Sequence, residues 1–137
     1  MERTLIILKP DTLKRKLVGE IITRFERKGF EIKKIKLLNP TPEQVEQHYI
    51  EHANKPFFQE LLAYFTSGPV IVMIIEGINA VGIARKMLGA TRAINAEPGT
   101  IRGDYAFLET ENLVHASDSV ESVIREINIW FDESEII

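Results

Sequence analysis

The sequence predicts an α+β fold. Short apolar or alternating runs, typical of strands, are separated by segments whose apolar residues recur every three to four positions, as in amphipathic helices. One run, Val70–Ile75, is apolar throughout and indicates a strand covered on both faces. The simplest topology for this order of elements is βαββαβ, a ferredoxin-like sheet with helices packed on it, inserted short helices and a C-terminal helix.

The first strand and helix are bounded by proline and glycine. Leu5–Leu8 is an apolar run that stops before Pro10, which cannot continue a central strand, so we expect Lys9 at one end of the sheet. A helix ending at Gly29 follows. Its apolar positions are Val18, Ile21, Ile22 and Phe25.

The next two elements carry local signals. Phe30–Leu38 predicts a second strand, and its alternation slips near Lys34, which indicates a bulge or an edge. The segment Thr41-Pro42-Glu43-Gln44 has the pattern of a capping box with proline in the first helical turn. The helix that it opens presents Val45, His48 and Tyr49.

Two further helices flank the apolar strand. One is expected to start near Pro56 and to stop at Gly68. Its apolar positions are Phe57, Phe58, Leu61, Leu62 and Phe65. The other is capped by Asn79 and ends at Gly89. Its apolar positions are Val81, Ile83, Ala84, Met87 and Leu88.

A loop of about a dozen residues follows, and loops of that length are often functional. It runs through Thr91, Arg92, Pro98, Gly99 and Arg102. We expect extended structure to resume near Tyr105–Leu108 and again at Leu113–Val114.

His115 lies where the last strand gives way to the C-terminal helix. Ser117 and Ser119 favour a helix start, and Asp118 with Glu121 has capping-box spacing. The expected apolar face is Val120, Val123, Ile124, Ile127, Trp130 and Phe131. A neutral imidazole at such a rim has one nitrogen free for attack and another that a carbonyl or carboxylate can orient, as a nucleophilic histidine requires. A lone histidine is more often a surface or capping residue, so other side chains must support this interpretation.

The composition bounds the class of protein. A length of 137 residues fits one domain, residues 1–137, and the absence of cysteine fits a reducing compartment, for which we expect the cytoplasm. We expect neither a signal peptide nor a membrane span. The net charge of −3 gives no overall attraction to nucleic acid, so phosphate binding would depend on local cations.

Three cations are candidates for holding phosphate. The chain has neither of the usual glycine-rich phosphate loops, so side chains would have to supply the contacts. Lys9 at a strand end, Arg85 on a helix and Arg102 in the long loop could converge on His115. Arginine grips phosphate oxygens in a bidentate fork, whereas lysine acts as a point charge. Taken singly, each is more often a solvated surface charge.

These residues belong to an ordered series of motifs. The series comprises Glu2–Leu5, Lys9–Asp11, Val18–Ile22, Arg24–Glu26, Lys28–Phe30, His48-Tyr49, Pro56–Phe58, Ser67–Val70, Glu76-Gly77, Met87–Gly89, Pro98–Asp104 and Asn112–His115. With it, the sequence resembles the nucleoside diphosphate kinase family along nearly its whole length.

The resemblance implies an activity and a set of roles. The implied reaction moves the γ-phosphate of a nucleoside triphosphate to a nucleoside diphosphate, by a ping-pong route through a phosphohistidine on His115. Ser117 and Glu126 would support His115, and Tyr49 would lie beside the transferring phosphoryl. Lys9, Arg85, Thr91 and Arg102 would hold the phosphates, Lys9 and Asn112 would reach the sugar, and Phe57 would stack on the base.

The resemblance also implies a cofactor and partners. Mg²⁺ would arrive with the nucleotide, with no metal site on the protein itself. A homo-oligomer is implied, a hexamer first and a tetramer next, and neither nucleic acid nor membrane is expected as a partner.

Two positions depart from the family. Ala116 replaces its usual glycine, which is tolerable if the backbone needs no positive φ, and Ala93 replaces a proline of many relatives.

Purely structural roles stay open for several of the candidate site residues. Phe57 and Tyr49 could be core aromatics, Asn112 a turn residue and Glu126 an exposed helix residue, although its spacing from Val123 and Trp130 places it beside the predicted buried stripe. Thr91 alone carries almost no signal.

Two other functions remain as alternatives. One is a non-catalytic nucleotide-binding or scaffold protein on the same fold. Such a protein would be expected to lack some of the five residues that this chain has, which are Lys9, Arg85, Arg102, Asn112 and His115. A ferredoxin-like nucleic-acid binder would need a basic face with exposed aromatics, which the net charge does not favour.

Overall fold

A single antiparallel sheet organises the computed structural model, which describes residues 1–108 and 111–136. Within those residues the strands are β1 (Glu2–Leu8), β2 (Glu31–Leu38), β3 (Val70–Gly77) and β4 (Val114–Ala116). Their order across the sheet is β2-β3-β1-β4, and every neighbouring pair is antiparallel. The predicted ferredoxin-like βαββαβ topology is therefore confirmed.

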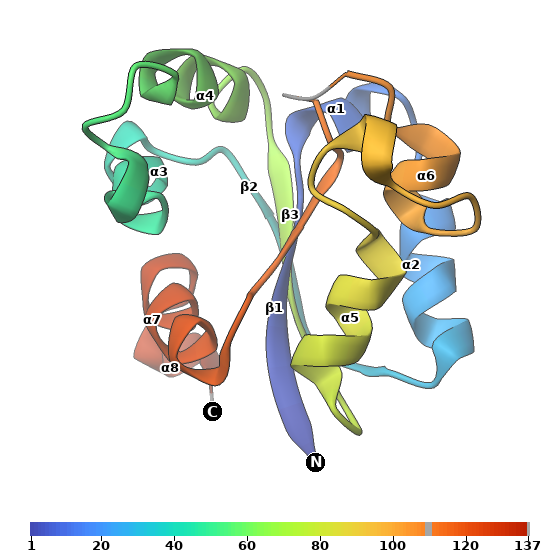
Figure 1. Cartoon of the computed structure of the whole chain (residues 1–137). Coiled ribbons are helices and arrows are strands. Elements are labelled where there is room, and N and C mark those ends of the chain that lie inside the picture. The colour runs from blue at the N-terminus through green and yellow to red at the C-terminus, as the bar shows by residue number, and fades with distance from the viewer. Residues whose placement is uncertain (109–110, 137) are drawn as a thin grey trace.

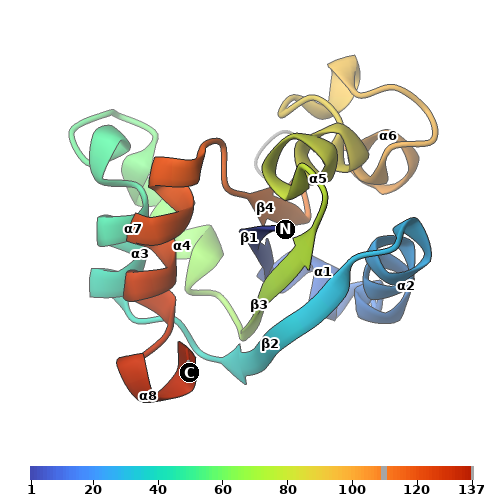
Figure 2. The ribbon, with the colours of Figure 1, turned by 90° about the horizontal axis from the view of Figure 1, so that it is seen from below.

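Helices cover both faces of the sheet. On one side lie α2 (Val18–Lys28), α5 (Ala80–Leu88) and α6 (Ile101–Tyr105), and on the other lie α3 (Pro42–His48), α4 (Phe58–Phe65) and α7 (Val120–Trp130) (Figures 1 and 2). Helix α1 (Pro10–Lys14) follows β1, and α8 (Glu133–Ile136) follows α7; neither was expected as a separate element. The 3₁₀ turns η1 (Ile50–His52) and η2 (Ala93–Asn95) lie between the longer helices.

The two faces of β1 feed two separate cores. Ile6 and Leu8 pack with Phe25 of α2 and with α5, whereas Leu5 and Ile7 pack with residues of α3, α4 and α7. Successive strand side chains point to opposite faces, so a strand covered on both sides must be apolar at every position. This explains the continuous apolar runs in β1 and β3.

Several local predictions are confirmed. Gly29 ends α2 with a φ of 115°, in the left-handed region. The capping box of α3 is complete: the Gln44 N–H donates to Thr41 Oγ1 at 3.1 Å, and the Thr41 N–H donates to Gln44 Oε1 at 2.9 Å. The register of edge strand β2 shifts between Ile32 and Lys34, where the sequence alternation slips.

The predicted caps of two helices are wrong. Ser119, and not Asp118 with Glu121, caps α7 by accepting the Ser122 N–H at 3.1 Å. A run of adjacent polar residues offers several caps, and only the backbone path selects among them. Helix α5 does begin after Asn79, but the Asn79 side chain makes no cap bond.

The cap of α5 comes instead from the other end of the chain. Glu2 Oε1 accepts the Val81 N–H at 2.8 Å. No local sequence pattern predicts such a contact, because the two residues meet only through the pairing of β1 with β3.

The extended structure predicted at Tyr105–Leu108 is also wrong. Tyr105 ends α6, and η2 shortens the loop before it. Helix α6 has five residues, too few to show a helical period. Its cap is Thr100, whose Oγ1 accepts the Gly103 N–H at 3.0 Å.

The predicted apolar face of α7 is partly wrong. Val123 and Trp130 are buried, but Val120 and Ile124 are 53% and 61% exposed. The buried stripe also contains Glu126, and at 100° per residue Ile124 lies about 160° around the helix from it. A buried carboxylate therefore sets the rotation of this helix.

Gly103 in α6 leaves no room for a side chain. A β-carbon there would collide with the carbonyl oxygen of Glu97 and crowd Thr100 Oγ1. We expect Gly103→Ala to lower the free energy of unfolding by about 1–3 kcal/mol, measured by chemical denaturation at fixed protein concentration. Gly82→Ala in α5 is the control, because nothing lies within 4 Å of a β-carbon there, and it should be neutral or stabilising. Equal stability of the two variants would contradict this account.

Candidate active site

His115 is the central residue of β4. It pairs with Ile7 of β1, and its side chain is 16% exposed, so the ring is held at the edge of the core. Ala116 lies in the strand, and its φ is not positive, so alanine is compatible with this position. His115 lines a pocket together with Tyr49, Arg85 and Glu126.

Glu126 of α7 orients the imidazole. His115 Nε2 lies 2.8 Å from Glu126 Oε1, and the Ser117 hydroxyl donates to the same oxygen at 2.7 Å. Glu126 is 4% exposed and Ser117 is fully buried, so both bonds are shielded from water. Burial raises the pKa of Glu126 above its usual value, an effect that the Ser117 bond opposes.

The other ring nitrogen, Nδ1, is left for chemistry. Burial lowers the pKa of His115 well below its usual value, and the neighbouring cations Lys9 and Arg102 lower it further. The ring is therefore neutral near pH 7. With the Nε2 hydrogen donated to Glu126, Nδ1 carries the lone pair, and it makes no hydrogen bond to the residues that the structure describes.

Lys9 is buried at the end of β1. Its Nζ donates to Asn112 Oδ1 at 2.7 Å, and the Asn112 amide donates to the Thr91 carbonyl at 3.3 Å. Burial, together with the charge of Arg102, lowers the pKa of Lys9 to about 7, against an opposing effect of Asp11. Lys9 can therefore be neutral in the free protein and gain a proton beside an anion.

The two arginines are fixed by backbone carbonyls. Arg102, 5% exposed, donates to the carbonyls of Val114 at 2.6 Å, Gly89 at 3.1 Å and Asn112 at 3.3 Å. Burial, with the charge of Arg85, lowers its pKa to about 10, which still leaves it charged at pH 7. Arg85 is exposed and donates to the Ala116 carbonyl at 3.1 Å.

The backbone that leads into β4 is strained at Leu113. Its φ is 74°, rare for a residue with a side chain, and the Val114 N–H donates to the Asn112 carbonyl at 2.8 Å across a tight turn. Asp11 accepts the Leu113 N–H at 3.1 Å, and Thr12 donates to its carbonyl at 2.7 Å.

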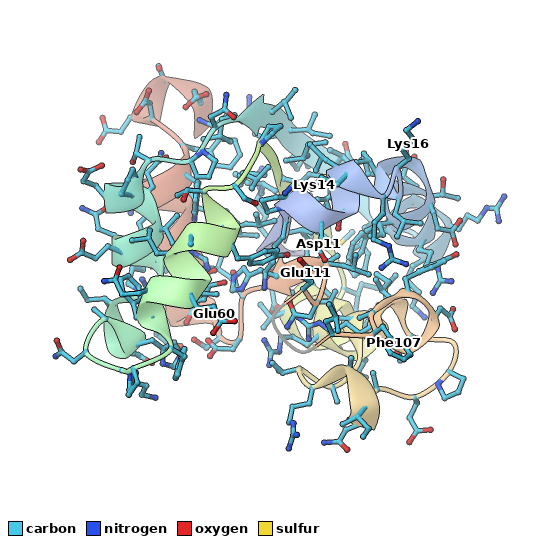
Figure 3. The ribbon with its side chains drawn as sticks, turned by 90° about the horizontal axis from the view of Figure 1, so that it is seen from above. Asp11, Lys14, Lys16, Glu60, Phe107 and Glu111 are labelled. Carbon is cyan, nitrogen blue, oxygen red and sulfur yellow. The ribbon has the colours of Figure 1, made fainter. Side chains whose placement is uncertain are left out.

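Tyr64 of α4 braces the same corner. Its hydroxyl donates to the other carboxylate oxygen of Asp11. Figure 3 looks onto this region, with Asp11 and Glu111 labelled between α1 and α4. The sequence did not single out Asp11 as a site residue, although its buried carboxylate holds the turn before His115 in place.

The aromatic candidates occupy different settings. Tyr49, at the end of α3, is half-buried in the pocket with His115, and burial and Glu126 raise its pKa, so its hydroxyl stays protonated. Phe57 is 48% exposed and precedes α4, so it is not the core residue that its sequence allows. Its ring packs against His52 at 5.6 Å between centroids, and Lys55 Nζ lies 5.8 Å from it.

The predicted residues thus fall into two groups. His115, Glu126 and Ser117 form one bonded cluster, and Lys9, Asn112, Thr91 and Arg102 form a second bonded network around the turn before β4. Arg85 and Tyr49 line the pocket, whereas Phe57 does not line it but packs its ring against His52, which does. One further residue of the site, His48, is predicted from the sequence only as part of a helix. It is buried, and its ring packs against that of His115.

Comparison with known proteins assigns the family. The family model for nucleoside diphosphate kinase matches residues 2–136. The chain belongs to the nucleoside diphosphate kinase family. It is 54% identical over 136 residues to the nucleoside diphosphate kinase of Halalkalibacterium halodurans, which covers 99% of this chain and 92% of that protein. It is 53% identical to that of Methanocaldococcus jannaschii, over 98% and 96% of the two chains.

Solved structures of the family have the same fold. The nucleoside diphosphate kinase of Encephalitozoon cuniculi superposes with a TM-score of 0.96 at 42% identity, over 98% of this chain and 92% of that one. The enzyme of Halobacterium salinarum, solved in complex with CDP, superposes with a TM-score of 0.95 at 43% identity, over 99% and 91%. The chain is therefore a nucleoside diphosphate kinase, a nucleotide-binding phosphotransferase, and not a non-catalytic relative. No helix in the described part of the chain is long and apolar enough to cross a membrane.

A phosphate beside Lys9 is expected to restore its proton. Since its pKa in the free protein is about 7, Lys9 is mostly neutral at pH 8, and an adjacent anion raises the pKa. ADP binding at pH 8 should therefore take up close to one proton, measured by calorimetry in buffers of different ionisation enthalpy. Lys9→Gln should abolish the uptake, whereas Lys14→Gln on α1 should preserve it. Equal uptake by wild type and Lys9→Gln would contradict the assignment.

Proposed function

We propose that the protein transfers the γ-phosphate between nucleotides in two half-reactions, through a phosphohistidine on His115. The observation that carries this proposal is the bond between His115 Nε2 and the buried Glu126, which leaves Nδ1 with its lone pair in a neutral ring. A nucleophile whose proton is already held by a carboxylate needs no base to activate it.

Each half-reaction exchanges one bond at phosphorus. In the first, Nδ1 of His115 attacks the γ-phosphorus of the donor, and the bond from that phosphorus to the β-phosphate oxygen breaks, which releases the diphosphate. In the second, a terminal oxygen of the acceptor diphosphate attacks the phosphorus and the N–P bond breaks. Glu126 stabilises the positive charge that develops on the imidazole as Nδ1 forms its bond.

The cations supply positioning and charge. Phosphoryl transfer depends mostly on holding the phosphates in line and on stabilising charge on their oxygens. Lys9, Arg85 and Arg102 would bind the phosphates with Thr91. Arg102 is already fixed by backbone carbonyls and keeps further N–H groups for a phosphate oxygen, so it needs little reorganisation.

The remaining residues would hold the nucleoside and the phosphoryl. Lys9 and Asn112 would reach the sugar, and the protonated Tyr49 hydroxyl would donate to the transferring group. The exposed ring of Phe57 offers a stacking face for the base. Stacking accepts any base because every base has a π-face.

Mg²⁺ would arrive with the nucleotide. The described residues contain one group with the spacing of metal ligands, His48, His115 and Glu126, and two of these three are imidazoles. Mg²⁺ prefers a shell of oxygens and keeps several waters while it bridges phosphates, so this group does not suit it. When bound, the ion would neutralise charge on the β- and γ-phosphates.

The assembly and location are inferred from weaker observations. Residues 1–137 form one domain in our interpretation, because both cores pack on a single sheet. Edge strand β2 exposes Ile35 and Leu37, at 50% and 64%, and closed symmetry is the usual way to cover such a surface, so we infer a homo-oligomer. The family resemblance implies a hexamer before a tetramer. Cysteine-free composition favours the cytoplasm, and the acidic net charge disfavours nucleic acid as a partner.

Incubation with γ-labelled ATP should place phosphate on His115. The label should be lost in acid and kept in base, as for a phosphorus–nitrogen bond, and initial-rate plots for donor and acceptor should be parallel. His115→Ala should prevent labelling, whereas His52→Gln, which changes a pocket residue outside the Glu126 cluster, should not. Labelling of His115→Ala, or intersecting rate plots, would overturn the mechanism.

Mg²⁺ should bind the protein only weakly in the absence of nucleotide. Calorimetric titration of the free protein should show no micromolar site, and ADP should create one, because the phosphates supply the oxygen ligands. Titration of ADP alone provides the control for the intrinsic affinity of the nucleotide. A micromolar Mg²⁺ site on the free protein would mean that its side chains form a metal cage.

A further inference from the structure

His48 and Trp130 form a buried polar pair beside the active site. His48 ends α3 and is 4% exposed, and Trp130 ends α7 and is 1% exposed. The Trp130 Nε1–H donates to His48 Nδ1 at 3.0 Å. An indole nitrogen can only donate, so His48 Nδ1 must present its lone pair. Burial lowers the pKa of His48 well below its usual value, so the ring is neutral and its hydrogen is on Nε2.

The Nε2 group of His48 is buried without a partner, as are Thr4 Oγ1 and His52 Nδ1 among the described residues. No hydrogen bond to Nε2 is present among the described residues. Buried donors are normally satisfied, and leaving one unpaired costs free energy, so its retention calls for a physical reason. The proposed mechanism assigns this group no role.

The ring of His48 packs directly on the nucleophile. Its centroid lies 4.3 Å from that of His115, and the two planes meet at 78°, edge to face. The His48 ring also contacts Tyr49 at 4.7 Å, Trp130 at 5.7 Å and Phe65 at 6.3 Å between centroids. These contacts hold it from several sides, so it forms a rigid surface.

The same side chains have the spacing of a zinc site, but the tautomer opposes that use. One ligand atom each from His48, His115 and Glu126 lies within 4.8 Å of the others. Ligation by His48 Nε2 would move its hydrogen to Nδ1, where it would face the Trp130 N–H, so that two donors would oppose each other. Ligation by Glu126 would also compete with the bond that orients His115.

Resting on the proposed phosphohistidine mechanism, we propose that His48 is a positioning residue for His115. The Trp130 hydrogen bond holds His48 as the Nε2–H tautomer. The His48 ring then forms a fixed surface against the His115 ring, which we call the wall. This wall keeps His115 with its Nε2 on Glu126 and its Nδ1 toward the pocket. The Glu126 bond fixes one nitrogen but leaves the imidazole able to pivot about that contact. The edge-to-face packing of His48 removes this freedom and so holds Nδ1 in line with the phosphorus.

This role predicts a specific kinetic pattern. His48 makes none of the hydrogen bonds that fix Lys9, Arg85 or Arg102, so weakening the wall should leave nucleotide affinity unchanged. The rate of His115 phosphorylation should fall, because misplacing a reacting atom by a fraction of an ångström slows the chemical step.

The single tryptophan of the chain allows a sharp test. Biosynthetic replacement of Trp130 by benzothienylalanine substitutes sulfur for the indole N–H and keeps the ring shape. In single-turnover experiments with ATP, phosphorylation of this protein should be about 10-fold slower, with the Kd for ATP within about twofold of wild type. Nitrogen NMR of wild type should show His48 as the Nε2–H tautomer. An unchanged rate, or a Nδ1–H tautomer in wild type, would overturn the proposal.

Two His48 variants provide a second test that retains the indole. His48→Gln places an amide near the position of Nε2, and His48→Asn places one near Nδ1. Glutamine should restore most of the phosphorylation rate, whereas asparagine, which leaves the edge facing His115 empty, should be about 10-fold slower. Gln59→Asn, at an exposed position of α4 outside the lining of the pocket, is the control for shortening a side chain and should match wild type. Equal rates for the Gln and Asn variants would contradict a wall at the Nε2 edge.

The outcomes separate this inference from the mechanism on which it rests. If wild type forms no phosphohistidine, the proposed function fails. If wild type is phosphorylated but the benzothienyl protein reacts equally fast, only the role of His48 fails. Zn²⁺ that shifts the His48 and His115 nitrogen resonances together in wild type would show metal ligation and would also overturn the inference.

Discussion

One buried carboxylate oxygen organises the active site. Glu126 Oε1 accepts both the His115 Nε2–H and the Ser117 hydroxyl, and so it joins α7 to the strand that carries the nucleophile. Because the carboxylate must point into the core, α7 is rotated so that Ile124 faces solvent and Val123 and Trp130 face the sheet. The same rotation places the Trp130 N–H against His48, so the packing of one helix fixes the surroundings of the nucleophile on two sides.

The cations are made compatible with burial by an irregular backbone. Buried charges are costly unless they are hydrogen-bonded. The turn at Leu113 places partners for these groups on both sides of it: the Arg102 guanidinium donates to the carbonyls of Asn112 and Val114, and Lys9 Nζ donates to the side-chain oxygen of Asn112. A positive φ at a residue with a side chain persists only where its surroundings enforce it, and Asp11 and Thr12 supply that constraint. The strained turn at Leu113, the hydrogen bonds around it and the cations Lys9 and Arg102 therefore form a single preorganised unit.

The sequence predicts what depends on local physics. The first three strands, the glycine that ends α2, the capping box of α3 and the bulge in β2 follow from residues close together in the chain, and all are present. The cap of α5 by Glu2 does not follow, because it needs the tertiary fold. The helical turn at Tyr105 does not follow either, because α6 is too short to show a period.

The site shows the same division. The motif named the nucleophile and its neighbours, but their roles depend on which atoms meet, and the sequence cannot supply those distances. His48 is the clearest case. In the sequence it is one more position near the end of an amphipathic helix, and only the approach of Trp130 and His115 from distant positions gives it a defined tautomer and a neighbour.

The central claim is that the bond to Glu126 leaves Nδ1 of His115 as the nucleophilic atom. The direct measurement is phosphorus and nitrogen NMR of the phosphorylated protein, uniformly labelled with nitrogen-15, to identify the ring nitrogen bonded to phosphorus. We predict phosphorus coupling at Nδ1, with the hydrogen retained on Nε2. Phosphate on Nε2 would contradict the account, because the bond to Glu126 would then have to break before the reaction.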